Sequence, residues 1–339
     1  MPSLQTVWFV LIGLLLVGYA VLDGFDLGAG IVHLFVARND EERRSVLAAI
    51  GPVWDGNEVW LITGGGALFA AFPMVYATVF SGFYLAVMLL LGALILRAVS
   101  IEFRSKETNG LWRRSWDVGF ALGSALAAFL FGVALGNVVR GLPLDGGVVY
   151  RGGLAGLLNP FAIVMGFLTL GLAAQQGSSW LVLKTEGAVR TRARRTGVAS
   201  TLVVITAWFV ATDIAWFDSN RVFDNFARNP LAWLGPVSSI IALASMLYAY
   251  SRRQELLAFV LSSVVIVGLA ATAGATLYPN LVPSVDATRS LTVNNAHSSD
   301  VTMTVMLVVA LVGMPIVLAY TGFIYWKFKG KVQLDEAGY

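Results

Sequence analysis

The sequence contains no cysteine and only two histidines, His33 and His297, among 339 residues. The absence of cysteine excludes disulfides, thiolate metal sites and iron–sulfur clusters held by this chain. The histidines fall near the end of the first apolar stretch and in a late polar connection, so they are not expected to bind one metal together. A multi-haem site needs several axial ligands, most often histidines. We therefore expect no metal site and no catalytic residue in this chain, and interpret both histidines as structural or surface residues.

Charged residues are also scarce, at 13% against 57% hydrophobic residues, and the mean hydropathy is +0.75. These values indicate a protein whose solvent is lipid. The net charge of +3 does not predict nucleic-acid binding, because the basic residues occur in short clusters between apolar runs. No basic residue precedes the apolar stretch that starts near Val7, so we interpret that stretch as a retained first span and not as a signal peptide.

Long runs of apolar residues are the main feature of this sequence. Since about 20 apolar residues are needed to cross a bilayer, the sequence predicts an all-α polytopic membrane protein with nine helices in a single domain, residues 1–339. We expect two four-helix bundles, near residues 1–140 and 155–280, and one extra helix near 301–328. The expected spans cover residues 7–36, 50–71, 77–100, 117–139, 160–183, 197–217, 231–250, 255–278 and 301–328.

The basic side chains predict the orientation of these spans. If the N-terminus lies outside, all but five of the 23 lysines and arginines fall in inner segments, and Arg97 is counted among these. Inner segments of membrane proteins carry the excess of basic residues. We therefore expect an extracytoplasmic N-terminus and a cytoplasmic C-terminus. The five outer residues are Arg140, Arg151, Arg221, Arg228 and Arg289.

Acidic residues inside the apolar runs are the main candidate functional residues. Asp23 and Asp26 are three residues apart in the first span, and Asp55 and Glu58 repeat this spacing in the second, so each pair shares a helix face. Measured from the expected inner helix ends at about 1.5 Å per residue, Asp55 lies at roughly 8 Å, Glu58 at roughly 12 Å, Asp26 at roughly 15 Å and Asp23 at roughly 20 Å. Carboxyls in lipid mark functional pathways unless they are paired.

Two interpretations of this acidic ladder remain open. In the first, burial disfavours the ionised carboxyl and suits it to proton exchange, so the ladder is a cytoplasmic proton entry route. In the second, some acids only accept hydrogen bonds from Asn57, tryptophan N–H groups or nearby backbone amides. The weaker candidates Asn137, Asp117 and Asp213 lie near expected helix ends and are interpreted as structural.

Glycines within the spans predict close helix packing. The run of glycines at 64–66 follows no strand, so it is interpreted as a packing surface and not as a phosphate loop. Small residues four apart let helix backbones approach each other in lipid. Such pairs are Gly24 with Gly28, Gly119 with Gly123 and Gly132 with Gly136.

Two longer segments, residues 18–28 and 54–73, contain the acidic pairs within the strings GYAVLDGFDLG and WDGNEVWLITGGGALFAAFP. With the shorter segments 81–84, 103–106, 158–161 and 290–292, they follow the order found in subunit II of the cytochrome bd quinol oxidases. The sequence resembles that family over nearly its whole length.

The resemblance implies an electrogenic quinol oxidase of the bacterial inner membrane that reduces O2 to water. The family places haem b and haem d in subunit I, the expected partner, and none in this chain. Asp26 and Asp55 match its acidic positions associated with proton uptake, whereas the position of Glu58 also takes an amide in the family. Trp54, Asn57 and Trp60 are expected to line a route for protons or O2.

Further partners and other function classes remain open. The resemblance leaves room for a structural quinone, small single-helix accessory subunits and membrane lipid around this chain. A proton-coupled secondary transporter would also use intramembrane acids, but it would show helices broken near the bilayer midplane and need no haem partner. A purely structural scaffold for the haem subunit would make Asp26 and Asp55 dispensable.

Overall fold

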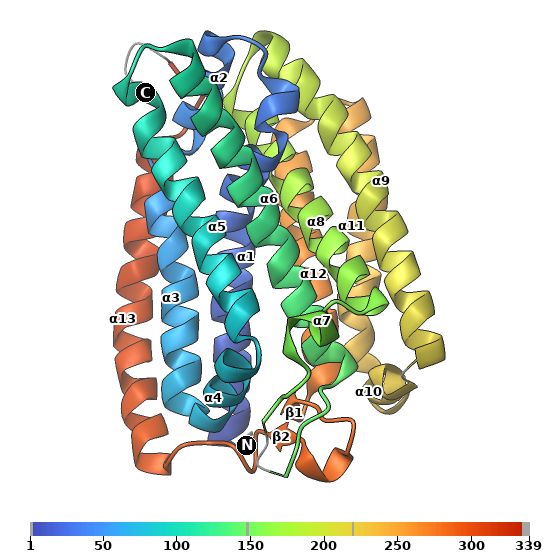
Figure 1. The fold of residues 1–339 in the computed structure, drawn as a ribbon. Coiled ribbons are helices and arrows are strands. Elements are labelled where there is room, and N and C mark those ends of the chain that lie inside the picture. Colours follow the sequence, from blue (N-terminus) through green and yellow to red (C-terminus); the bar gives the residue numbers. More distant parts are fainter. Residues whose placement is uncertain (1–2, 147–148, 219, 334–339) are drawn as a thin grey trace.

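The fold is described by a computed structural model, which covers residues 3–146, 149–218 and 220–333. Long helices run between two ends of the molecule (Figure 1). One end, called here the α2 end, carries the short helix α2 (Asp40–Ile50) and the last turn of α13 (Asp300–Lys327). The other, called the β end, carries the start of α1 (Leu4–Val36) and the paired strands β1 (Asn280–Val282) and β2 (Leu291–Thr292).

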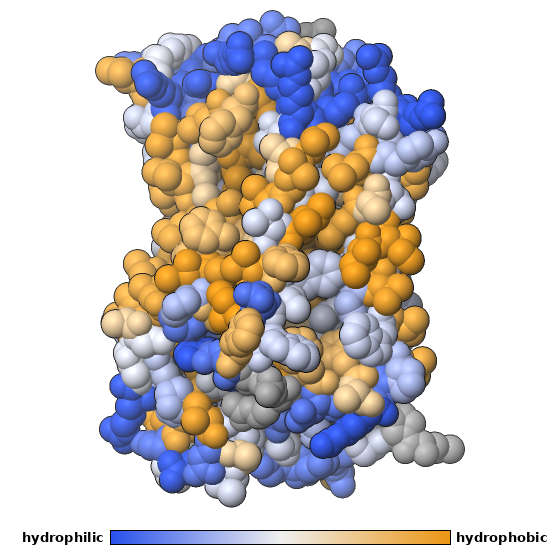
Figure 2. Space-filling model, turned by 90° about the vertical axis from the view of Figure 1, so that its right-hand side faces the viewer, coloured by the Kyte–Doolittle hydropathy of each residue, from blue (hydrophilic) through white to orange (hydrophobic). Residues whose placement is uncertain are grey.

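The prediction of an all-α membrane protein is confirmed. The described residues contain eight helices that are long and apolar enough to cross a membrane, and a ninth span if the bent pair α3 (Trp54–Ala71) and α4 (Pro73–Gly82) counts as one. Figure 2 shows the corresponding apolar band across the molecule, with hydrophilic residues gathered at both ends. Besides α1 and α13, the long helices are α5 (Tyr84–Phe103), α6 (Gly110–Arg140), α8 (Pro160–Lys184), α9 (Gly187–Asp218), α11 (Leu234–Ser251) and α12 (Glu255–Leu277).

The remaining elements are short. Two further helices, α7 (Gly153–Leu157) and α10 (Asp224–Arg228), lie toward the β end (Figure 1). Single 3-10 turns are η1 (Arg104–Lys106), η2 (Asn220–Phe223), η3 (Pro230–Trp233) and η4 (Ala287–Arg289).

The predicted bounds of the third span, 77–100, are wrong, because residues 73–82 form α4, which is bent by 120° from α3. Pro73 is the cause of the break: its ring disfavours the helical conformation at the preceding residue and it cannot donate a backbone hydrogen bond. Phe72 accordingly leaves the helical region, with φ −134° and ψ 66°. The third span begins only after a second break, at Tyr84.

Charged helical turns explain two other boundary errors. The second span begins at Trp54 and not at 50, because residues 40–50 form the separate helix α2, whose first turn is capped by the Asn39 side chain. Helix α9 begins at Gly187, ten residues before the predicted 197. Its added turns carry arginines that pair with acids of other elements, as Arg192 does with Glu42 at 2.5 Å. Polar turns can therefore extend a helix beyond its apolar span.

Helix α1 packs against α3, α6 and α8. At Gly28 the backbones of α1 and α8 meet so closely that a Cβ would lie 1.8 Å from the carbonyl oxygen of Ala173. Gly123 and Gly132 meet neighbouring backbones in the same way, which confirms close packing there, whereas a Cβ at Gly24 would lie in ordinary contact, 3.9 Å from the Ile266 side chain. Because α1 contacts helices from both halves of the chain, the halves share one interior, and their division into two four-helix bundles stays a prediction.

A network of neutral polar side chains joins α8 to α1, α9 and α12. Gln176 of α8 donates to Ser263 of α12 at 2.9 Å and to the carbonyl of Val21 in α1 at 3.1 Å. Gln175 donates to Thr201 of α9 at 3.0 Å. In lipid such hydrogen bonds connect helices that have no hydrophobic drive to associate, so we interpret this network as structural.

Candidate functional site

The four acidic residues of the predicted ladder come from two helices that pack on each other. Asp23 and Asp26 occupy one face of α1, and Asp55 and Glu58 lie in the first two turns of α3. The break at residues 51–53 between α2 and α3 starts the helix just before the second pair. The structure therefore brings the two pairs to the same region, but it gives each carboxyl a different environment.

Asp23 forms a fully buried ion pair that the sequence did not indicate. Its carboxylate oxygens accept hydrogen bonds of 2.6 and 2.9 Å from the two terminal nitrogens of Arg97 in α5. Both side chains have 0% exposure. The assignment of Arg97 to an inner connecting segment was wrong, because it lies inside α5. A two-point contact with a guanidinium is among the strongest ionic contacts of a carboxylate, so it fixes the position of the Asp23 side chain.

Glu58 shares the same arginine. Its carboxylate lies 3.2 Å from Nη1 of Arg97, and its side chain is 28% exposed. Arg97 is thus placed between two carboxylates from different helices. Because Glu58 has this single ionic contact among the described residues and reaches the surface of the chain, it is held less tightly than Asp23.

Asp26 is fully buried with a neutral partner. Its Oδ2 accepts a 2.7 Å hydrogen bond from the amide of Asn57, while Oδ1 has no partner among the described residues. The Asn57 carbonyl in turn accepts from the hydroxyl of Tyr325 in α13 at 3.0 Å. This chain of hydrogen bonds connects α1, α3 and α13. Among the described residues no cation is bonded to Asp26, in contrast to Asp23 with its arginine.

Asp55 is exposed on α3 and makes no hydrogen bond or ion pair with any described residue. Its predicted depth of roughly 8 Å is wrong, because α3 begins at Trp54 and Asp55 is only its second residue. The same shift brings Glu58 closer to the helix end. Along α3 the exposed side chains of Val59 and Ile62 and the exposed backbone of Gly66 continue the stripe of Asp55 at helical spacing.

The two tryptophans of the second motif pack within the chain. Trp54 is buried at 8% exposure. The ring of Trp60 covers Gly18 of α1, where a Cβ would lie only 2.5 Å from the ring. The Trp60 ring therefore packs α3 against α1, and the role of both tryptophans in lining a route stays a prediction.

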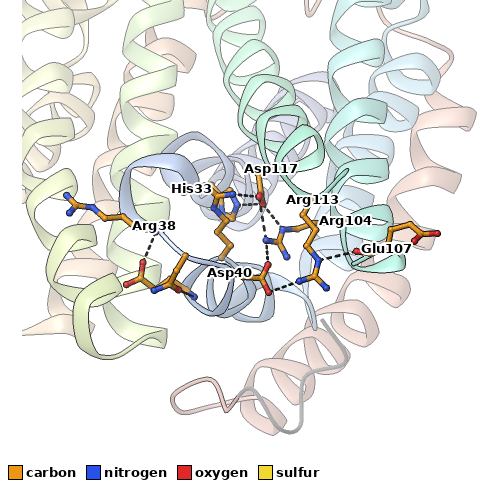
Figure 3. Close-up of polar contacts among 10 residues, drawn as sticks. His33, Arg38, Asp40, Arg104, Glu107, Arg113 and Asp117 are labelled. Atoms are coloured by element: carbon orange, nitrogen blue, oxygen red, sulfur yellow. Dashed lines mark hydrogen bonds and ion pairs between the residues drawn. The ribbon is translucent and has the colours of Figure 1, made fainter. Parts of the chain in front are cut away.

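A second buried cluster lies at the α2 end around Asp117 of α6, and Figure 3 shows side chains from several elements pointing toward it. One oxygen of Asp117 lies 2.8 Å from Nε2 of His33 and 2.6 Å from Nε of Arg104. The other accepts from Arg43 of α2 at 2.6 Å. His33 and Asp117 are fully buried. Their structural interpretation agrees with this arrangement, which ties α1, α2, α6 and η1 together.

Asp40 continues this cluster toward the surface. It accepts from Arg104 at 2.8 Å and from Arg113 at 2.9 Å (Figure 3). Burial, the largest influence on the Asp40 carboxyl, raises its pKa, but the two guanidiniums outweigh burial and hold that pKa below its usual range. Asp40 therefore stays ionised near neutral pH and contributes to the attachment of α2.

The remaining candidate residues have different surroundings in the structure. Asn137 donates to the carbonyls of Val133 and Leu157 at 2.8 Å each, in keeping with a structural role. Asp213 is exposed in α9 without such partners among the described residues. His297 lies in the connection after α12, with Nδ1 2.7 Å from the carbonyl oxygen of Ser298. Within the described residues, no group of three or more histidine or acidic side chains is arranged to hold a metal ion.

Sequence reasoning missed two residues of the site, Arg97 and Tyr325. An arginine six residues before the end of an apolar helix can be read equally well as a residue reaching the membrane surface. Only its packing beside Asp23, which is 74 positions away in the sequence, distinguishes the two cases. Tyr325 is 268 positions from Asn57, and no local pattern connects them.

Comparison with known proteins gives a consistent result. Residues 4–328 match the family model described as cytochrome bd terminal oxidase subunit II. The chain is 36% identical to cytochrome bd-I ubiquinol oxidase subunit 2 of Escherichia coli (strain K12), covering 98% of this chain and 96% of the relative. It is 34% identical to cytochrome bd ubiquinol oxidase subunit 2 of Bacillus subtilis (strain 168), covering 99% of both.

A solved structure shares the fold. The bd oxidase from Geobacillus thermodenitrificans contains a chain that superimposes with a TM-score of 0.80, covering 96% of this chain and 99% of that one. The sequence identity is 15%, so this likeness is evidence for the arrangement of the helices alone.

Proposed function

The chain belongs to the cytochrome bd terminal oxidase subunit II family, and from this premise we propose that the acidic turns of α1 and α3 admit protons to the oxidase. As a member of this family, the chain is a subunit of a membrane quinol oxidase, which passes electrons from quinol to O2. Family membership removes the reason for considering a proton-coupled transporter. The break between α3 and α4 is explained by Pro73, and the described residues contain no second bent pair of this kind that would favour that class.

The observation that carries the proposal is the contrast between Asp26 and Asp23. Asp26 is buried against a neutral amide, whereas Asp23 is held by the two-point contact with Arg97. A proton carrier must bind and release its proton without large rearrangement, which a carboxyl without a bound cation does more readily. We therefore assign proton transfer to Asp26 and Asp55, and assign Asp23 to an electrostatic role.

Asp55 is proposed to be the residue of the route that lies on the surface of this chain. An ionisable side chain facing hydrocarbon is costly, and such residues normally face protein or a water-filled cavity. Asp55 faces neither within this chain, so we propose that it faces subunit I. The stripe of Val59, Ile62 and Gly66 beside it would then lie in the same interface. Glu58, partly exposed and bound to Arg97, stands between this interface and the buried acids.

The first prediction tests this route in the purified complex. Asp26→Asn and Asp55→Asn keep the size of the side chain but cannot carry a proton, so each is expected to slow O2 reduction by about 10 to 1,000 fold. Asp23→Asn and Glu58→Gln should slow it less. The rate of O2 consumption with excess quinol is measured across pH 6 to 8 (roughly the range in which a tuned carboxyl titrates), together with haem content.

Asp300→Asn is the matched control, because Asp300 is an exposed acid at the β end of α13 that has no part in the route. Normal haem content with slow turnover supports a proton role. If both the Asp26 and the Asp55 variants assemble and turn over at the parental rate, the scaffold interpretation replaces the proton route.

The cofactors and partners follow from the same premise. We propose that subunit I carries haem b and haem d, that quinol is the substrate of the complex, and that the complex lies in the bacterial inner membrane. A structural quinone in this chain and single-helix accessory subunits stay predictions. Trp54, Asn57 and Trp60 are proposed to border the route, with Asn57 in direct contact with Asp26.

A further inference from the structure

A cavity of about 380 Å³ opens at the β end between α6, α8 and α9, away from the acidic turns of α1 and α3. Its walls combine charged and apolar side chains. Its principal lining residues are Arg140, Asn159, Phe161, Asp213, Phe217 and Asp218. The proton route makes no use of these residues, so the cavity requires an explanation of its own.

One cation and two acids line this cavity, and one of the acids is paired with the cation. Arg140, the last residue of α6, donates to Asp218, the last residue of α9, at 2.6 Å. Asp213, by contrast, makes no hydrogen bond or ion pair with any described residue. The 25-residue helix α8 begins at Pro160 in the cavity wall, and the start of a helix favours negative charge. One part of the cavity thus favours an anion and another favours a cation.

The cavity also lies where a lipid headgroup would be. After its arginine-rich first turns, α9 crosses the hydrocarbon core with the roughly 20 residues that this requires, so its last turn, at the β end, reaches the headgroup layer. Asp213 lies five residues before its end. Phe217 is 81% exposed and Trp216 is 62% exposed beside it, and tryptophans are typical of this interfacial layer. Phe161 supplies an apolar wall on the side of α8.

We propose that this cavity binds the headgroup of a phospholipid that carries a primary ammonium, as phosphatidylethanolamine does. The ammonium would donate to Asp213, and the phosphate would lie toward Arg140 and the start of α8. The acyl chains would leave past Phe217 along the outside of α9. A quinone head offers no cation for Asp213, and an anionic glycerol headgroup would bring a second negative charge to it.

The test compares lipids bound to the intact oxidase complex. The complex is reconstituted in nanodiscs that contain equal parts of phosphatidylethanolamine, phosphatidylcholine and phosphatidylglycerol, then released and analysed by native mass spectrometry. Phosphatidylethanolamine is expected to be retained in preference to phosphatidylcholine, whose trimethylammonium cannot donate a hydrogen bond. Asp213→Asn is expected to weaken this retention about tenfold, as for the loss of one charge-assisted hydrogen bond.

Asp224→Asn is the matched control, because Asp224 is an exposed acid on α10 that does not line the cavity. It should retain the lipid as the parental complex does. Equal retention by the parental and Asp213→Asn complexes would overturn the proposal, as would preferred retention of phosphatidylglycerol or of quinone. Turnover with quinol in detergent, measured for each variant, shows that the complexes are assembled and tests the lipid site separately from the proton route.

Discussion

At the scale of single residues, Arg97 determines how the acidic ladder is divided. Its guanidinium binds Asp23 through two hydrogen bonds and Glu58 through one ionic contact, and it has 0% exposure. A buried arginine is tolerated only where carboxylates compensate its charge. The same two hydrogen bonds satisfy the buried carboxyl of Asp23, so one cation compensates acids from two different helices. Asp26, one turn away, is left with an amide.

The second prediction concerns this ion pair. Arg97→Gln would leave Asp23 buried without its cation, and breaking one side of a buried pair costs about 3 to 5 kcal/mol of stability. We expect a lower thermal unfolding temperature and a lower yield of assembled complex. The double variant Arg97→Gln with Asp23→Asn removes both charges and should recover much of the loss. Equal damage in the single and double variants would contradict the importance of the pair.

The residues of the site were predictable from the sequence only in part. The spacing of Asp23 with Asp26 and of Asp55 with Glu58 was sufficient to select all four carboxyls, because acids in apolar helices are rare. It did not reveal their partners. Asp26 and Asp23 differ by one helical turn and look alike in the sequence, yet one faces Asn57 of α3 and the other Arg97 of α5. Helix rotation and packing, which depend on distant residues, decide this difference.

At the scale of elements, the close contact of α1 with α8 depends on glycines, which have no side chain, at Gly28 and Gly177. A Cβ at Gly28 would lie 1.8 Å from a backbone oxygen and 2.6 Å from the backbone nitrogen of Gly177. Backbone atoms cannot turn away as a flexible side chain does, so the helices would have to separate. This crossing positions the face of α1 that carries the acidic pair.

The third prediction compares two glycines of the same helix. Gly28→Ala is expected to prevent assembly or to lower the thermal unfolding temperature strongly, because overpacking of a tight contact costs about 1 to 3 kcal/mol or more. Gly24→Ala is the control, since its nearest atom would be 3.9 Å away, and it should assemble normally. Both are measured by haem content and thermal unfolding of the purified complex. Similar behaviour of the two variants would show that the crossing is not as tight as described.

Helix bounds were predicted well where apolar character and helix coincide, as in α8 and α12, and poorly where they separate. The arginine-rich start of α9 is helical although polar, and α2 is helical although it lies outside the spans. Hydropathy reports solvent preference and not backbone conformation. Pro73 marks a real break in the helix, just before the predicted start of the third span. The bounds of that span were wrong because the prediction ran through the second break, at Phe83.

At the scale of the whole molecule, the two ends differ in charge. The α2 end carries the arginines of α2, η1 and the start of α9, whereas the β end carries few basic residues. The positive-inside rule therefore still predicts a cytoplasmic α2 end, even with Arg97 removed from the connecting segments. The prediction of orientation from sequence is robust for this reason: it depends on many residues and not on one.

The fourth prediction tests this orientation by using the absence of native cysteine. Lys329→Cys, just after α13, and Asp286→Cys, beside the strands, are both exposed positions at opposite ends. A membrane-impermeant maleimide should label Asp286→Cys in intact cells and label Lys329→Cys only after lysis. The reverse labelling pattern would mean that the protein has the opposite orientation in the membrane. The entry of the acidic route would then lie on the outer side.

The fifth prediction concerns which face of the molecule meets subunit I. In Figure 1, α13 and α3 lie at one edge of the bundle and α9 at the opposite edge. The edge formed by α3 and α13 carries the exposed Asp55, and only 6% of the apolar window of α13 is buried. Gly65 and Gly66 have no atom within 4 Å of a Cβ position, so this surface permits the close helix approach typical of membrane interfaces.

A photoreactive probe on a single cysteine can distinguish the two edges. Gly66→Cys, labelled with a benzophenone maleimide and illuminated in the assembled complex, should form an adduct with subunit I. Phe209→Cys on α9, which is 73% exposed, is the control and should react with lipid only. If the adduct forms from Phe209→Cys and not from Gly66→Cys, then Asp55 does not face the haem subunit. The proton route would lose its outer member, while the buried contact of Asp26 with Asn57 would remain.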